Sequence, residues 1–151
     1  MRRQPPSCVR PMPHRKALDA TLRSMQPPRR RSQPSRSFRD LRVWQEALKL
    51  AVNVDRLVTP LDRGPRAKLA DQLRRASNSV QSNIAEGWGR RTADDRKLRY
   101  TYAWSSLGEV EGHLIELELS NRVDTAAVRA CSLQARHVGR LLTAFRRKPH
   151  R

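Results

Sequence analysis

The sequence predicts an all-α protein, an up-down-up-down antiparallel four-helix bundle with a disordered basic N-terminal arm. Apolar residues recur every three or four positions through four stretches between residues 38 and 147, which is the period of one helix face. Short connections with proline, glycine or capping residues separate these stretches, so consecutive helices should lie antiparallel. No stretch shows the strict apolar–polar alternation of a half-buried strand.

The first 37 residues differ in composition from the rest of the chain. They hold ten Lys and Arg residues against one Asp, and seven of the ten prolines. Such a segment has too little apolar surface to offset its ordering entropy, so residues 1–37 are expected to be a disordered basic arm. Met25 is an alternative start, in which case the preceding residues would not be translated. Residues 148–151 are expected to form a basic tail after a bundle spanning residues 38–147.

The first helix is expected over residues 40–58, with Asp40 just before its apolar stripe. Val43, Leu50 and Val52 lie off that stripe and add apolar surface that one inward face does not need. Thr59, Pro60, Gly64 and Pro65 then mark a loop. The stripe itself consists of Leu41, Trp44, Ala47, Leu48, Ala51, Val54, Leu57 and Val58.

The second helix is expected over residues 66–85. Gly87 and Gly89 follow it and are expected to end it, because glycine favours the conformations found at helix C-termini. The opposite face of this helix is polar. Its apolar stripe consists of Leu69, Leu73, Ala76, Val80 and Ile84.

The third and fourth helices are expected over residues 93–120 and 125–147. Thr92, with Asp95 three residues later, resembles a capping box, and Asp124 is a suitable N-cap for the last helix. Their core stripes are Ala103, Leu107, Val110, Leu114 and Leu117 on the third helix, and Val128, Cys131, Ala135, Val138, Leu142 and Phe145 on the fourth.

The chain is strongly basic, with 32 Lys and Arg residues against 14 Asp and Glu, a formal net charge of +18. A compact protein with that charge repels itself unless a polyanion is near, so nucleic acid or an anionic membrane surface is the expected partner. Arg outnumbers Lys heavily, and its guanidinium group binds phosphate with two parallel hydrogen bonds, which favours nucleic acid. No apolar run approaches the ~20 residues of a membrane span. We therefore expect a soluble, cytoplasmic protein.

Three segments of the chain resemble a known bacterial family. Residues 38–47 (FRDLRVWQEA), 73–76 (LRRA) and 82–91 (SNIAEGWGRR) are similar to the 23S rRNA-intervening-sequence protein family. The resemblance covers about residues 38–121 and implies a four-helix bundle that assembles into a ring-shaped homopentamer. A related branch resembles the accessory protein of diversity-generating retroelements, which binds a reverse transcriptase and its RNA. Tyr100, Tyr102, Trp104 and the long basic ends depart from the family pattern.

The connection between the second and third helices is the predicted nucleic-acid-binding surface. Basic residues before and after it are expected to converge at one end of the bundle, where they would contact phosphates together. Trp88 lies between two glycines, where it either stacks on an unpaired base or plugs the end of the bundle. The predicted binding residues are Arg74, Arg75, Trp88, Arg90, Arg91, Arg96, Lys97 and Arg99.

The sequence offers no convincing catalytic, cofactor or metal site. Cys131 occupies an apolar helix position, which is typical of an inert packing residue, and Cys8 has no partner at a zinc or disulfide spacing. Glu109, His113 and Glu116 share one helix, but facing ligands on the other helices are missing. We expect a non-enzymatic, RNA-binding accessory protein that forms homo-oligomers, without a cofactor or metal. The alternatives are a scaffold for an acidic protein such as a polymerase, and a membrane-surface protein.

Overall fold

The computed structural model describes residues 36–120 and 123–147, which form four long α-helices and two short 3-10 helices. In chain order these are η1 (Phe38–Asp40), α2 (Arg42–Val58), η2 (Thr59–Leu61), α3 (Ala67–Gly89), α4 (Ala93–Leu119) and α5 (Thr125–Arg146). No strand occurs within the described ranges, and the all-α prediction is confirmed. The expected disordered arm lies outside these ranges apart from Arg36 and Ser37, and so does the expected tail of residues 148–151.

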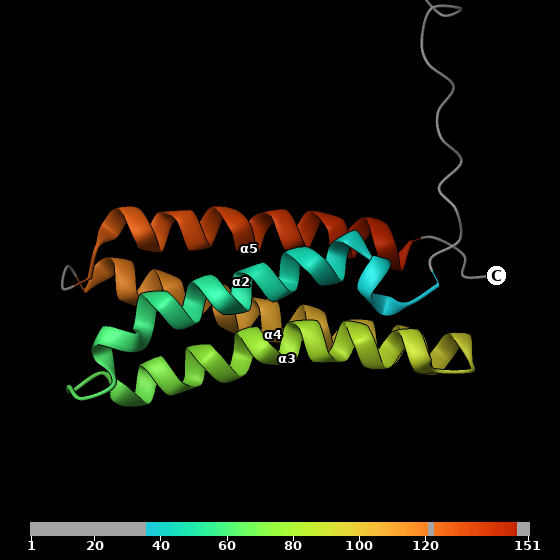
Figure 1. Ribbon diagram of the computed structural model, residues 1–151, viewed down its shortest axis with the longest axis horizontal. Coiled ribbons are helices and arrows are strands. Elements are labelled where there is room, and N and C mark those ends of the chain that lie inside the picture. The colour runs from blue at the N-terminus through green and yellow to red at the C-terminus, as the bar shows by residue number, and fades with distance from the viewer. Residues whose placement is uncertain (1–35, 121–122, 148–151) are drawn as a thin grey trace, which may run out of the picture. The chain divides into compact units, whose positions relative to one another are not determined.

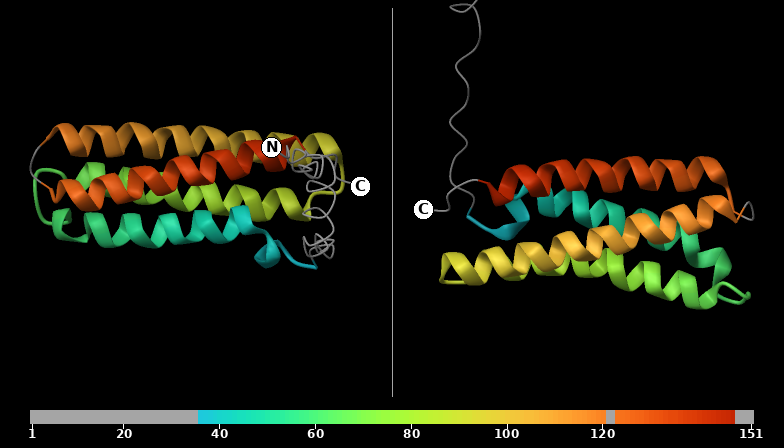
Figure 2. Two further views of the ribbon diagram at one scale, coloured as in Figure 1. Left: turned by 90° about the horizontal axis from the view of Figure 1, so that it is seen from above. Right: turned by 180° about the vertical axis from the view of Figure 1, so that it is seen from behind.

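The four helices run up, down, up and down along one axis (Figure 1). α2 packs against α3 and α5, and α4 packs against the same two helices, so α2 and α4 occupy opposite corners of the bundle. The views from above and from behind show the same order (Figure 2). This topology brings the start of α2, the end of α3, the start of α4 and the end of α5 to one end of the bundle, here called the α3–α4 end.

The chain enters the bundle through a capped 3-10 turn, so the first α-helix begins two residues later than predicted. Ser37 and Asp40 form a reciprocal capping box around η1, and the Asp40 carboxylate accepts hydrogen bonds from the backbone N–H groups of Arg36 and Ser37 at 2.9 and 3.0 Å. Asp40 therefore caps η1, and Leu41 is the N-cap residue of α2. Phe38 packs edge-on against Trp44, with ring centroids 5.0 Å apart.

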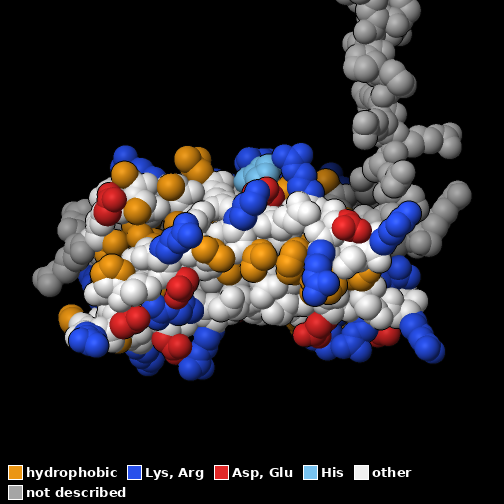
Figure 3. All heavy atoms as spheres, viewed as in Figure 1, with side chains coloured by type: hydrophobic (Ala, Val, Ile, Leu, Met, Phe, Trp, Pro, Cys, Tyr) orange, Lys and Arg blue, Asp and Glu red, His pale blue; other side chains and the backbone are white. Residues whose placement is uncertain are grey.

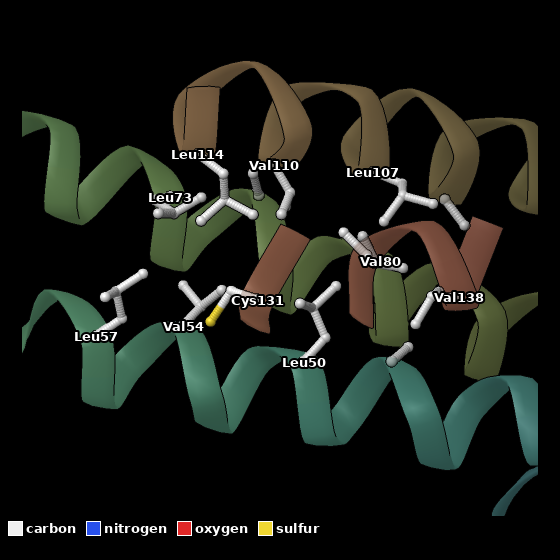
Figure 4. Packing of buried hydrophobic residues seen from close by; sticks show 14 of the residues in the cluster. Leu50, Val54, Leu57, Leu73, Val80, Leu107, Val110, Leu114, Cys131 and Val138 are labelled. Carbon is white, nitrogen blue, oxygen red and sulfur yellow. The ribbon is translucent and has the colours of Figure 1, made fainter. Parts of the chain in front are cut away.

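The core contains the predicted stripes of α3 and α4 completely, and every predicted position of α5 except Phe145, which is half-buried against it. Figure 4 shows side chains from all four helices meeting along the axis, among them Leu50, Leu73, Leu114 and Val138. On α2 the prediction was wrong in part: Val43 and Leu50 are buried, whereas Leu48 is 38% exposed. The buried face of α2 is thus rotated from the predicted stripe.

The predicted end of the second helix was also wrong, because α3 continues through both glycines to Gly89. Gly87 is buried, and a Cβ atom added to it would collide with the ring of Tyr100 on α4. Glycine is therefore needed at position 87 because α3 and α4 approach each other closely there. The helix α3 ends at Gly89, three residues before Thr92.

Both predicted caps of the later helices are confirmed. The Thr92 hydroxyl accepts a hydrogen bond from the Asp95 N–H, and the Asp124 carboxylate accepts one from the Ala126 N–H. Each cap satisfies one amide that has no partner within its helix. Among the helices of the described part, none combines the length and the apolar character that a membrane span requires.

Candidate nucleic-acid interface

Charge is distributed unevenly between the two ends of the bundle. Three segments meet at the α3–α4 end, residues 36–42, 86–99 and 136–147, and together they hold 12 basic and 4 acidic residues. The described segments of the opposite half, residues 52–75, 109–120 and 123–129, hold 7 basic and 8 acidic residues. The bundle is therefore polarised, with an excess of eight positive charges at one end and none at the other. Figure 3 shows a band of hydrophobic side chains along α2 with charged side chains of both signs around it.

The α3–α4 connection carries the cluster predicted from the sequence, here called the inter-helix cluster: Arg90, Arg91, Arg96, Lys97 and Arg99. Glu86, one turn before the end of α3, neutralises part of it. One carboxylate oxygen of Glu86 lies 2.9 Å from Arg99 Nη1 and 3.7 Å from Arg90 Nη2. Arg90 and Arg99 are therefore held by the protein's own carboxylate, which reduces what they can offer to a ligand.

Arg91, Arg96 and Lys97 have no carboxylate within 4.0 Å in the described ranges. Arg91 and Lys97 are exposed. Arg96 is half-buried, and its guanidinium group donates hydrogen bonds to the backbone carbonyls of Thr92 at 3.2 Å and Arg91 at 3.5 Å. Arg96 thus braces the turn, while Arg91 and Lys97 are available to bind an anion.

Arg74 and Arg75 do not join this cluster, contrary to the prediction that all these residues converge. They lie in the first half of α3, towards the opposite end. Arg74 Nε lies 2.7 Å from Asp55 Oδ1, and its Nη1 and Nη2 atoms lie 2.6 and 2.9 Å from the Asp62 carboxylate. This two-pronged pair raises the pKa of Arg74 and lowers the pKa of Asp62. Arg75 pairs with Asp71 at 2.9 Å.

Trp88 lies in the last turn of α3, where it is half-buried and packs against the hydrophobic core. Of the two interpretations left open by the sequence, this contact fits the plug at the end of the bundle. A base would have to displace core contacts to reach the buried part of the ring. Trp88 is therefore a supporting residue of the site in this conformation.

The sequence pattern did not assign to the site the basic residues at the ends of the first and last helices. Arg36, Arg39 and Arg42 lie around the start of α2, and Arg146 and Arg147 lie at the end of α5. Arg146 reaches α4, where its Nη2 donates to Thr101 Oγ1 at 3.4 Å. The antiparallel topology is the signal that would have found them, because it brings the outer ends of the first and last helices beside the connection between the middle two.

The described residues hold no group of three or more His, Cys, Asp or Glu side chains arranged to bind a metal. His113 Nδ1 lies 3.8 Å from Glu116 on the same helix, and this pair lacks ligands from a facing helix. Cys131 is buried in the core, and burial raises the pKa of its thiol, which favours the neutral and unreactive form.

A family model described as "23S rRNA-intervening sequence protein" matches residues 39–144, well over half of the chain. A crystal structure of a protein of unknown function from the S23 ribosomal protein family of Bacteroides thetaiotaomicron is similar, with a TM-score of 0.63 and 18% sequence identity. That similarity covers 70% of this chain and 99% of the other. No curated protein matches the chain significantly.

Proposed function

Because the chain belongs to the 23S rRNA-intervening sequence protein family, we propose that it is a non-enzymatic accessory protein that binds RNA through the α3–α4 end of its bundle. The polarised charge is the observation that carries this proposal, since eight excess positive charges gather where the helices expose Arg91 and Lys97. The reference to ribosomal RNA in the family description favours RNA over DNA. We place the protein in the cytoplasm, where such an RNA would be met.

The arrangement suits phosphate contacts better than base recognition. Guanidinium and ammonium groups on an exposed turn bind backbone phosphates and release condensed counterions, which gives affinity without strong sequence preference. Two helix C-termini, those of α3 and α5, also lie at this end. Their negative dipole ends stabilise the arginines placed beside them, among them Arg90 and Arg146.

We also propose that the protein acts as a homo-oligomer, a pentamer by its resemblance to the family. Several large apolar side chains of α4 lie in solvent in the single chain, and Ile115 and Leu119 are the most exposed of them at 57% and 79%. Contiguous exposed apolar surface is typical of a protein–protein contact. A ring of copies would present several basic ends to one RNA, so that each copy strengthens the binding of the next.

A matched pair of charge-removing variants tests the RNA site. The substitutions Arg91→Gln, Arg96→Gln and Lys97→Gln remove three charges at the α3–α4 end, and glutamine keeps a donor for the Thr92 carbonyl. The control substitutions Arg56→Gln, Arg63→Gln and Lys68→Gln remove three charges near the opposite end, from side chains that are exposed. Binding of a structured RNA to the full chain is measured by titration between 50 and 300 mM salt (roughly the range in which phosphate contacts dominate).

The first variant should bind RNA more weakly than the control, and its salt slope should fall by roughly 0.7–0.9 for each phosphate group that the variant no longer binds. Equal affinity and equal slope for the two variants would contradict the assignment of the site. If an acidic protein binds through the same three residues while RNA does not, the protein is instead an interaction scaffold for a partner such as a reverse transcriptase or another polymerase.

A further inference from the structure

A groove of about 550 Å³ lies between α4 and α5, on the half of the bundle nearer the α3–α4 end. Its lining residues include Trp104, Leu107 and Gly108 from α4, and Arg136, Gly139 and Arg140 from α5. Figure 2 shows α4 and α5 running side by side along the bundle.

One wall of the groove is basic. Arg136 and Arg140 of α5 line it together with Arg147, the C-cap residue of α5, and their spacings of four and seven residues keep them on one side of the helix. Within residues 36–120 and 123–147, none of the three lies within 4.0 Å of a carboxylate oxygen. The next arginine on this side, Arg129, differs because its Nε is 2.9 Å from Glu118. Among the described residues, the groove therefore holds three guanidinium groups without a carboxylate partner and one lining carboxylate, Glu111.

The facing wall is aromatic and open. Trp104 is 42% exposed, so part of its indole is covered by protein and part faces solvent. Gly139 gives room for this arrangement, since a Cβ atom there would contact Leu107 at 3.4 Å and Trp104 at 3.8 Å. A Cβ atom at Gly108 would meet nothing within 4 Å, so this glycine leaves an open space on the groove wall.

We propose that the α4–α5 groove binds a nucleotide of a single-stranded RNA segment, with the unpaired base stacked on Trp104 and the adjoining phosphates on Arg136, Arg140 and Arg147. The ligand class rests on the proposed function, while the site itself is distinct from the inter-helix cluster. An indole face stacks on any base, and guanidinium forks bind phosphate oxygens through paired hydrogen bonds. The volume is in the range of small-ligand sites.

The positive charge of the groove favours a nucleotide over a second copy of the chain as its occupant. A copy packed on this groove through apolar contacts would have to bury three guanidinium groups without carboxylate partners, and unpaired buried charge is strongly destabilising. A phosphodiester backbone supplies the missing negative charges at a regular spacing. Duplex RNA would not satisfy the site, because its bases are already stacked and cannot reach Trp104.

The test uses the full chain and a fluorescently labelled ten-nucleotide single-stranded RNA of mixed sequence, with the duplex of the same sequence as second probe. Trp104→Ala removes the stacking surface, and Gly108→Leu fills the groove. Each has a matched control on the same helix: Tyr102→Ala removes an aromatic ring with similar exposure, and Gly112→Leu adds a side chain where a Cβ also meets nothing within 4 Å. Neither control residue lines the groove.

Trp104→Ala should weaken single-strand binding by about 5- to 150-fold, the range measured for the removal of base stacking, and should leave duplex binding unchanged. Gly108→Leu should weaken single-strand binding similarly, whereas both controls should bind like the unmodified chain. Helicity, measured by far-ultraviolet circular dichroism, should be equal in all four variants. The double variant Arg136→Gln and Arg140→Gln should lose more single-strand affinity than Arg56→Gln and Arg63→Gln.

Single-strand binding by the two groove variants that equals that of their controls would overturn the proposal. So would a loss of self-association in Trp104→Ala with RNA binding intact, because the groove would then be an interface between copies. If the proposed function is wrong, the full chain binds neither the single-stranded nor the duplex RNA. If only the groove proposal is wrong, the inter-helix substitutions still weaken RNA binding.

Discussion

The ring of Tyr100 on α4 lies directly against the Cα of Gly87 on α3, in the space where any other residue would carry its Cβ. Tyr100 is 2% exposed and packs edge-on against Phe145 of α5, with ring centroids 5.0 Å apart. The ring therefore connects α4 with both α3 and α5 near the α3–α4 end. Burial raises the pKa of its hydroxyl, so the side chain stays neutral at physiological pH.

Gly87→Ala should destabilise the protein, although alanine is the better helix former. The added methyl group collides with a ring that also packs against Phe145, and overpacking of this kind costs about 1–3 kcal/mol. Gly89→Ala is the matched control, because a Cβ there meets nothing within 4 Å. Chemical denaturation of both variants gives the comparison. An unfolding free energy for Gly87→Ala equal to that of Gly89→Ala would show that the two helices are farther apart than described.

Leu114→Ala and Leu142→Ala should each destabilise the bundle by about 2–5 kcal/mol. Both side chains are fully buried, on α4 and α5 respectively, so each truncation leaves a cavity among neighbours from other helices. Leu133→Ala on α5 is the control, since this leucine is 65% exposed. Thermal or urea unfolding distinguishes the three. A small loss of stability for both buried positions would mean that the core can collapse around the missing atoms.

The sequence alone predicted three of the four helix faces because their apolar residues repeat without interruption. On α2 it failed, because Val43, Trp44, Ala47, Leu48, Leu50 and Ala51 are apolar on several sides at once, and periodicity cannot choose among them. The packing of α2 between α3 and α5 determines which of these side chains are buried. The role of Gly87 could not be predicted for a similar reason. Its contact Tyr100 lies on another helix, and the sequence pattern around Gly87 describes only its own helix.

The candidate site was predicted in part. The inter-helix cluster lies where the sequence indicated, but Arg74 lies apart from it and pairs with Asp55 and Asp62. The sequence pattern did not indicate these ion pairs, because a loop separates both acidic residues from Arg74. The charge polarity could not be read along the chain, since residues 38–121 hold 14 basic and 12 acidic residues and are nearly neutral. Only the antiparallel topology sorts these charges between the two ends.

Acid should weaken the bundle through the Arg74 network. Hydrogen bonding to Arg74 lowers the pKa of Asp62 in the folded chain below its ordinary value of 3.8. The ionised carboxylate therefore stabilises the fold fully at pH values above 3.8. The contribution is lost as the pH falls through the lowered folded pKa. Arg74→Met should therefore be less stable than the unmodified chain at pH 6, and the difference should shrink towards pH 2. Thermal unfolding across this range measures it. A difference independent of pH would exclude ionic linkage.

The same substitution separates structure from binding. Arg74→Met should bind RNA no more weakly than Arg75→Met, which removes one charge from an exposed pair with Asp71 on the same helix. A specific loss of RNA affinity in Arg74→Met, with helicity retained, would show that Arg74 belongs to the binding surface despite its ion pairs.

Cys131 should react slowly with a disulfide reagent in the folded protein. Its burial both shields the sulfur and raises the thiol pKa, which reduces the thiolate fraction at pH 8. A Cys8→Ser variant leaves Cys131 as the single cysteine of the chain. Its modification rate should increase about tenfold or more on denaturation in urea. Rates that are equal in the folded and unfolded states would place Cys131 in solvent and contradict the position of α5.

Self-association should depend on the exposed apolar face of α4 more than on that of α2. Ile115 and Leu119 lie one turn apart, on the same side of α4, and are 57% and 79% exposed, whereas Leu48 and Val52 of α2 are 38% and 42% exposed. An interface between copies is stabilised most by the side chains that have most surface left to bury.

The double variant Ile115→Lys with Leu119→Lys should therefore shift the assembly to monomers at micromolar concentration. The double variant Leu48→Lys with Val52→Lys should shift it less. Sedimentation velocity measures both. All four positions face solvent in the single chain, so the helicity of both variants should be unchanged. A lower sedimentation coefficient would then reflect a lost interface between copies and not unfolding. A monomeric unmodified chain, or dissociation by the α2 variant alone, would show that α4 does not mediate assembly.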